Sequence, residues 1–99
     1  MKFEWDEAKN KENARKHGER FEDACYVFAD VCGLSKFDEE HSEIEDRWVL
    51  LARSPLTGKV LVVIHTYREY QGRESVRIIS ARPATRKERA AYLERARKR

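Results

Sequence analysis

Three segments rich in β-branched and aromatic residues, separated by two turn-like stretches, limit the fold that this chain can adopt. The segments are RWVLLARS at 47–54, KVLVVIHTYR at 59–68 and SVRIISAR at 75–82, with the turns SPLTGK and EYQGRE between them. They predict three antiparallel strands joined by two hairpins. A chain of 99 residues buries only about two-thirds of its unfolded surface, so we expect one modest core. Residues 1–99 are therefore predicted to form one domain, with a frayed tail from about residue 94.

Two helices are predicted before these strands. KFEW reads as a short strand or extended lead-in, after which Asp6 can cap a helix that runs to about Lys16 and stops at Gly18. A second helix begins at about Phe21, and its apolar residues recur at helical spacing. We assign this stripe to the core: Phe21, Ala24, Cys25, Phe28 and Ala29.

A third helix is predicted after the strands. Thr85 and Glu88 have the spacing of a capping box, so the helix should start near Arg86 and carry Tyr92 and Leu93 inward. The fold class is therefore α+β, with two N-terminal helices, a three- to four-stranded antiparallel sheet and a C-terminal helix. We expect the helices to cover one face of the sheet and to leave the other face partly open.

The charge of the chain is polarised along the sequence. The formal net charge is +3 and the sequence pI is about 9.0, a mild bias toward polyanions. Basic residues dominate 66–99, whereas 37–46 is an acidic run. A basic sheet region beside an acidic loop favours a protein that binds nucleic acid over a structural domain with an evenly charged surface.

The composition points away from several other classes of protein. Cys25 and Cys32 lack a second cysteine pair or a histidine cluster, so no disulfide framework, zinc site, other metal or cofactor is predicted. No apolar run approaches the roughly 18 residues of a membrane span, and the N-terminal residues lack the apolar stretch of a secretory signal. We expect a cytoplasmic protein that does not bind membranes.

An open sheet face with arginine, histidine and tyrosine side chains suits a ribonuclease that works without a metal. RNA can be cleaved by its own 2′-OH: a base removes the proton, cations stabilise the charge on the phosphate, and an acid protonates the leaving oxygen. Arginine fits the cationic role because its guanidinium binds two phosphate oxygens and stays protonated.

Arg77 and Arg82 are the leading candidates for that cationic role. They are five positions apart, so a regular strand would point them to opposite faces. Arg77 would lie on the open face and Arg82 at the strand exit beside a helix start, where anions are also attracted. A structural ion pair, for example with Glu45, is about as probable for either arginine.

The candidates for acid or base are His17 and Glu45. Histidine exchanges protons near neutral pH, but His17 stands beside Gly18 at a helix end, where a capping role is favoured by its position. Glu45 is a candidate base, or one member of a solvated acidic loop. His65 lies inside an apolar strand and is predicted to be a satisfied core or edge residue.

Four further residues on the predicted strands are candidates for RNA binding. Arg47, Arg53 and Arg68 could contact phosphates, although a solvated sheet edge explains them equally well. Tyr67 could stack on a base, as in single-stranded RNA binders, or pack across the strands.

Two segments of the chain resemble the BrnT toxins of bacterial toxin–antitoxin systems, small relatives in shape of the RelE ribonucleases. The segments are FEWDEAKNKENARKHGERFEDACYVFAD and VRIISARPATRKERAAY, which carry W-D-x-x-K, K-H-G and R-I-I-S-A-R in order. The resemblance runs from Phe3 to Tyr92. It implies a RelE-like fold and adds Lys9 and Lys16 to the candidates that contact RNA.

The resemblance also implies an activity and partners. It implies metal-independent endoribonuclease activity, toxicity when free, and neutralisation by a BrnA-type antitoxin of the ribbon–helix–helix class. It further implies a heterotetramer with that antitoxin and contact with operator DNA only through it. The alternative function is a non-catalytic module that keeps the toxin fold and binds an antitoxin or RNA.

Overall fold

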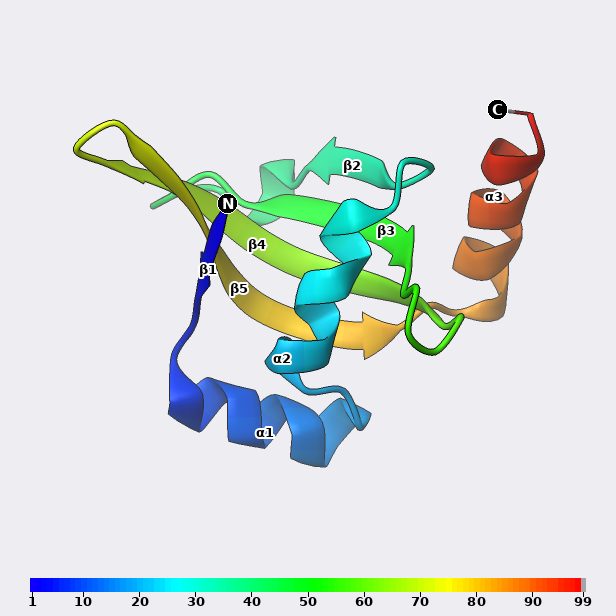
Figure 1. The fold of residues 1–99 in the computed structure, drawn as a ribbon, viewed down its shortest axis with the longest axis horizontal. Coiled ribbons are helices and arrows are strands. Elements are labelled where there is room, and N and C mark those ends of the chain that lie inside the picture. Colours follow the sequence, from blue (N-terminus) through cyan, green and yellow to red (C-terminus); the bar gives the residue numbers. More distant parts are fainter. Residues whose placement is uncertain (99) are drawn as a thin grey trace.

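The chain forms a five-stranded mixed sheet of strand order β1-β5-β4-β3-β2 in the computed structural model, which describes residues 1–98 (Figure 1). The short strand β1 pairs in parallel with β5, and the other neighbours are antiparallel. The predicted α+β class and both hairpins are confirmed. The prediction of three to four strands, all antiparallel, is wrong, because the sheet has five strands and one parallel pair. The strands are β1 Lys2–Glu4, β2 Leu34–Phe37, β3 Trp48–Arg53, β4 Val60–Tyr70 and β5 Arg73–Pro83.

Helix α1 spans Glu7–His17 and has both of its predicted caps. Asp6 Oδ1 accepts hydrogen bonds from the backbone N–H groups of Ala8 at 2.9 Å and Lys9 at 3.2 Å. Gly18 ends the helix with φ 74°, in the left-handed region where a residue without Cβ is favoured. Local capping chemistry therefore fixes both ends of this helix.

The second helical segment begins at Phe21 as predicted but changes its period. Helix α2 spans Phe21–Ala24 and continues as the 3₁₀ helix η1, Cys25–Ala29. Because a 3₁₀ helix has three residues per turn, the buried stripe runs through Phe21, Ala24 and Val27, each fully buried. The prediction that Ala29 lies in the core is wrong, since Ala29 is exposed.

Helix α3 spans Arg86–Arg97 and starts with the predicted Thr85–Glu88 capping box. Tyr92 is buried as predicted, but Leu93 is 39 % exposed, so the prediction that it points inward is wrong. The helix continues through Arg97, well into the segment predicted to fray from about residue 94. Arg99, the end of that predicted tail, lies outside the described residues.

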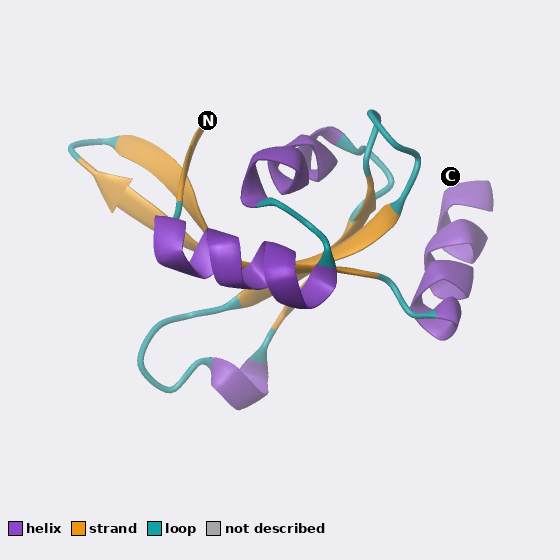
Figure 2. Ribbon diagram, turned by 90° about the horizontal axis from the view of Figure 1, so that it is seen from below, coloured by secondary structure: helices purple, strands orange, loops and turns teal. Residues whose placement is uncertain are grey.

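The helices divide the sheet into two unlike faces. Figure 2 shows α2 on one side of the sheet and the segment with the short helix η2, Glu39–His41, on the other side. Helix α1 runs along the β5 edge, where Asn13 bonds to the backbone of Ala81. We call the side packed by α2 and η1 the covered face. It holds the core, including Phe21, Val63, Val76, Ile78 and Ala81. The opposite side is the open face. Helix α1 lies at the β5 edge and α3 at the end of the strands (Figure 1), so the prediction that the helices cover one face holds for α2 but not for α1 and α3.

A β-bulge in β5 decides which side chains reach the open face. Ile64 pairs with Ser80 and the next residue, His65, pairs with Ile78, so Ile79 is an extra residue in β5. The extra residue shifts the alternation of side chains by one position. Arg77 and Arg82 therefore lie on the same face of the sheet, and the prediction that they point to opposite faces is wrong.

Candidate functional site

Four polar side chains form a row across the open face. Strand pairing sets Glu4 of β1 beside Arg77 of β5, and Arg77 beside Thr66 of β4. The pairing of Trp48 with His65, extended by one residue, places Arg47 beside Thr66. A carboxylate, two guanidinium groups and a hydroxyl thus come from three neighbouring strands and the residue just before β3, and we call these residues the open-face row: Glu4, Arg77, Thr66 and Arg47.

The open-face row contains polar atoms that the protein itself does not satisfy. Thr66 is 2 % exposed, and its Oγ1 has no hydrogen-bond partner within the described residues. The buried Nε of Arg47 is also without a partner there. Buried polar groups are nearly always paired in folded proteins, so unpaired atoms in one place indicate that a ligand or solvent completes them.

Arg77 is half-buried and makes no ion pair with any residue of 1–98. Its neighbour Glu4 instead lies 3.7 Å from Arg68, measured from Oε1 to Nε. The guanidinium of Arg77 is therefore available to an anion at the centre of the sheet.

Sequence reasoning missed Glu4 as a site residue. It belongs to a three-residue strand that pairs in parallel with β5, more than seventy positions along the chain. No local pattern signals such a long-range pairing. The one usable signal is the alternation in KFEW, which buries Phe3 against Phe28 and so turns Glu4 to the other face.

Arg82 is held in a bidentate ion pair with Glu88 of helix α3. Its Nη1 and Nη2 donate to the two carboxylate oxygens of Glu88 at 2.7 and 2.9 Å. The hydrogen bonds from Arg82, followed by those from Thr85, lower the pKa of the Glu88 carboxyl to about 2. This pair fastens the end of β5 to the start of α3, so Arg82 has a structural ion-pair partner, whereas Arg77 has none among residues 1–98.

Arg53 lies at the end of β3 against helix α3. Its guanidinium carbon is 5.6 Å from the centroid of the Tyr92 ring, and its buried Nε has no partner in residues 1–98. The Tyr92 hydroxyl donates to Asp30 Oδ2 at 2.5 Å, and burial, followed by this carboxylate, raises the pKa of Tyr92 to about 12. Arg53 helps to dock α3 by stacking on Tyr92.

Glu45 lies in the acidic segment beside Arg47. The segment shapes a shallow pocket of about 380 Å³, on the open-face side of the sheet. Glu45 itself is exposed. The structure thus brings Glu45 and Arg47 together around one pocket, whose lining residues are Glu40, His41, Glu43, Ile44, Glu45 and Arg47.

The candidates on helix α1 do not join the open-face row. His17 is the last residue of α1 and is exposed, as are Lys9 and Lys16. The helix lies along the β5 edge, where Asn13 bonds to the backbone of Ala81, whereas strand register places Arg77 on the open face. Within residues 1–98 His17 makes no hydrogen bond or ion pair with a member of the open-face row.

The aromatic candidates belong to the covered face. His65 is fully buried, its Nδ1 lies 3.2 Å from the carbonyl oxygen of Val63, and burial lowers its pKa. The predicted core role of His65 is therefore confirmed. Tyr67 packs edge-on against His65 at 5.2 Å between ring centroids and remains 44 % exposed. Tyr67 and Arg68 are consecutive in β4 and so lie on opposite faces, and it is Arg68 that lies on the open face.

Residues 1–98 hold no group of three or more His, Cys, Asp or Glu side chains arranged to bind a metal ion. None of the helices in this range is both long enough and apolar enough to cross a membrane.

The fold and the open-face row define a small α+β domain that displays cationic groups on one uncovered side of a sheet. A family model described as "Ribonuclease toxin, BrnT, of type II toxin-antitoxin system" matches residues 5–88, and the chain belongs to this family. The resemblance drawn from the sequence is therefore confirmed. The comparison with curated proteins gives no match. As a member of this family, the chain is expected to have ribonuclease activity and an antitoxin partner, the two properties that the description of the family names.

Proposed function

We propose that the protein is a metal-independent endoribonuclease toxin that cleaves RNA on its open face. The observation that carries this proposal is the open-face row, in which Arg77 has no ion-pair partner and two buried polar atoms are unsatisfied within the described part of the chain. A phosphodiester would supply the missing acceptors. The family assignment supports the choice of RNA as the substrate.

In this proposal Arg77 and Arg47 bind the phosphate at which the RNA breaks. Their guanidinium groups stabilise the negative charge that grows as the 2′-oxygen attacks phosphorus. Thr66, which lies between them by strand register, donates its hydroxyl to a phosphate oxygen. The 2′-oxygen to phosphorus bond forms and the bond to the 5′-oxygen breaks, which leaves a 2′,3′-cyclic phosphate and a 5′-hydroxyl.

Glu4 is the proposed base, because it is the carboxylate that strand register sets beside Arg77. Glu45, which shares a pocket with Arg47, is the proposed source of the proton for the leaving oxygen. His17 ends helix α1 at the β5 edge and has no part in this scheme. Arg82 acts only by holding β5 and α3 together through Glu88.

The remaining cations bind the RNA chain outside the reacting linkage. Arg68 lies on the open face next to Glu4, and Arg53 lies at the far end of the same face. Phosphate contacts of this kind set position and affinity without selecting bases. Lys9 and Lys16, exposed on α1, would contact only RNA that wraps around the sheet edge.

We also propose the partners that the resemblance implies. The antitoxin is of the BrnA type, with a ribbon–helix–helix module, and toxin and antitoxin form a heterotetramer in the cytoplasm. Operator DNA is bound through the antitoxin alone. Native mass spectrometry of the co-expressed pair tests this assembly: a mass of two toxins and two antitoxins supports it, and a stable one-to-one complex contradicts it.

Cleavage of RNA in the presence of EDTA tests the activity. The purified toxin should cut single-stranded RNA with EDTA present and leave 2′,3′-cyclic or 3′-phosphate ends, identified by mass spectrometry. Cleavage that requires added Mg²⁺ contradicts the mechanism. Intact RNA that still binds the protein, with affinity that falls steeply with salt, supports the non-catalytic binding module instead.

A further inference from the structure

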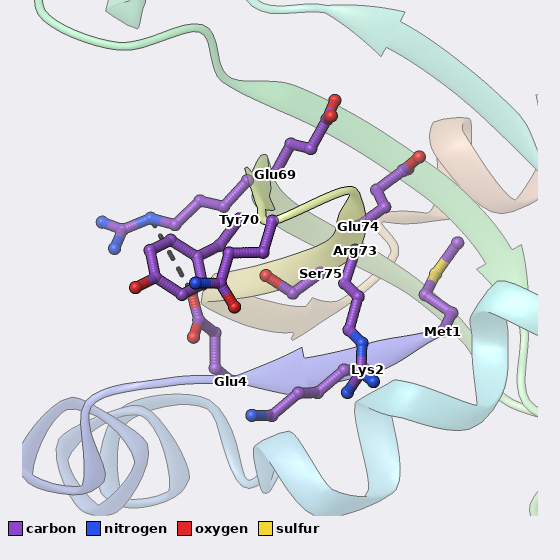
Figure 3. A pocket seen from close by; sticks show the side chains of 10 residues that line it. Met1, Lys2, Glu4, Glu69, Tyr70, Arg73, Glu74 and Ser75 are labelled. Atoms are coloured by element: carbon purple, nitrogen blue, oxygen red, sulfur yellow. Dashed lines mark ion pairs between the residues drawn. The ribbon is translucent and has the colours of Figure 1, made fainter.

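We propose that a pocket beside the β4–β5 hairpin binds a second nucleotide of the RNA substrate, next to the linkage that is cleaved. This inference rests on the proposed function and names a subsite for it. The pocket has a volume of about 1370 Å³ and lies between β1 and the hairpin (Figure 3). Its lining includes Lys2, Arg68, Tyr70 and Arg73, and we call it the hairpin pocket.

The Tyr70 side chain is exposed and contributes no packing to the core. It is 75 % exposed, and within the described residues its ring makes no aromatic pair, unlike the ring of Tyr67. Tyr70 and Arg68 are two residues apart in β4, so their side chains lie on the same side of the hairpin, and both line the pocket. An exposed tyrosine of this kind provides a platform on which any base can stack.

The cations of the hairpin pocket are placed to bind phosphate. Lys2 and Arg73 make no ion pair with any residue of 1–98, whereas Arg68 is partly neutralised by Glu4 at 3.7 Å. Figure 3 shows the Arg73 side chain reaching down from the hairpin to β1, the strand from which Lys2 extends. Lys2 and Arg73 could contact a phosphate and the ring of Tyr70 could stack on a base, which are the two kinds of contact that bind a nucleotide.

The acidic residues of the hairpin do not block this use. Glu69 and Glu74 pair directly across β4 and β5, and their position in the strands turns them to the opposite face from Arg68 and Arg73. Figure 3 shows them on the other side of the hairpin from Lys2. Both still line the pocket, as does Glu4, which lies 3.7 Å from Arg68. The proposed phosphate position is therefore on the side of Lys2 and Arg73, away from Glu69 and Glu74.

The hairpin pocket continues directly into the open-face row. Arg73 and Arg77 are both in β5, four residues apart, which corresponds to about 13 Å along a strand. The loop is preorganised, because Gln71 and Gly72 both have positive φ, 51° and 76°, as in a two-residue type I′ turn. A nucleotide bound here would be a near neighbour of the linkage held at Arg77.

Binding of an uncleavable RNA tests the subsite. The probe is a fluorescein-labelled eight-nucleotide 2′-O-methyl RNA, and fluorescence anisotropy gives its Kd for the full chain. We expect Tyr70→Ala to weaken binding about 10-fold, the size of effect that loss of one base stack produces, and Tyr70→Phe to bind within twofold of wild type. The matched control is Tyr26→Ala, which removes another exposed tyrosine, 50 % exposed in η1, and should leave Kd unchanged.

Cleavage of substrates of two lengths provides the second measurement. Tyr70→Ala should lower kcat/KM for an eight-nucleotide RNA about 10-fold but change that of a dinucleoside monophosphate by less than twofold. If Tyr70→Ala binds and cleaves the longer RNA as well as the wild type does, the subsite is overturned and the proposed function is left intact. Weaker binding by Tyr70→Ala together with an inactive wild type would support the subsite and overturn the proposed activity.

Discussion

The two faces of the sheet use polar groups in opposite ways. On the covered face the buried His65 is satisfied: its Nδ1 lies 3.2 Å from the carbonyl oxygen of Val63, and its Nε2 lies 3.4 Å from the Tyr67 hydroxyl. On the open face Arg47 and Thr66 keep buried atoms without partners in residues 1–98. Unsatisfied buried atoms reduce stability. The comparison indicates that the covered face is organised for folding, whereas the open face has the unpaired polar groups expected of a binding surface.

The largest predicted effect on stability lies on the covered face. Phe21 is fully buried and packs edge-on against Trp5, with ring centroids 6.2 Å apart. Phe21→Ala should lower the free energy of unfolding by about 3–5 kcal/mol through lost burial and a residual cavity. Urea denaturation followed by circular dichroism measures it. Tyr26→Ala, an exposed site in the neighbouring 3₁₀ helix, should change it by less than about 0.5 kcal/mol.

A smaller effect is predicted where the open face meets helix α3. Because the pKa of Glu88 is lowered to about 2 in the folded protein, from a usual value of 4.5, the Arg82–Glu88 pair stabilises the fold above pH 4.5 and is lost as the pH falls toward 2. Since both side chains are about one-third exposed, 39 % and 32 %, Arg82→Met should cost only about 1 kcal/mol at pH 7. Its unfolding free energy should depend less on pH between 5 and 2 than that of wild type, as measured by urea titrations across this range.

RNA cleavage by the same variant tests whether Arg82 has a structural role rather than a catalytic one. The rate of RNA cleavage by Arg82→Met should stay within about threefold of wild type, because its guanidinium is already occupied by Glu88. If cleavage is 100-fold slower while the free energy of unfolding is unchanged, the structural role is contradicted and Arg82 would instead act on the phosphate that is cleaved.

The elements governed by local chemistry could be predicted from the sequence. Asp6 and Gly18 bound helix α1, and Thr85 with Glu88 starts helix α3, because each motif satisfies backbone groups within one turn. The two hairpins followed from alternating strands and turn residues. In each case the interacting groups are close in sequence.

The features that depend on long-range pairing could not be predicted. Ile79 bulges only relative to the partner strand β4, and this one residue brings Arg77 and Arg82 to the same face. Glu4 reaches the site through parallel pairing with β5. Asn13 of α1 also bonds to Ala81, sixty-eight positions away. The candidate site was therefore found only in part: Arg77 and Arg47 were predicted, and Glu4 and Thr66 were not.

The most direct test of the account compares stability and cleavage in one variant, Arg77→Met. This change removes the unpaired guanidinium at the centre of the open face and keeps a side chain of similar length. We predict single-turnover cleavage of RNA in EDTA about 100- to 1000-fold slower than wild type, with the free energy of unfolding within about 0.5 kcal/mol of wild type. Cleavage within twofold of wild type by the folded variant would contradict the claim that Arg77 acts on the RNA phosphate.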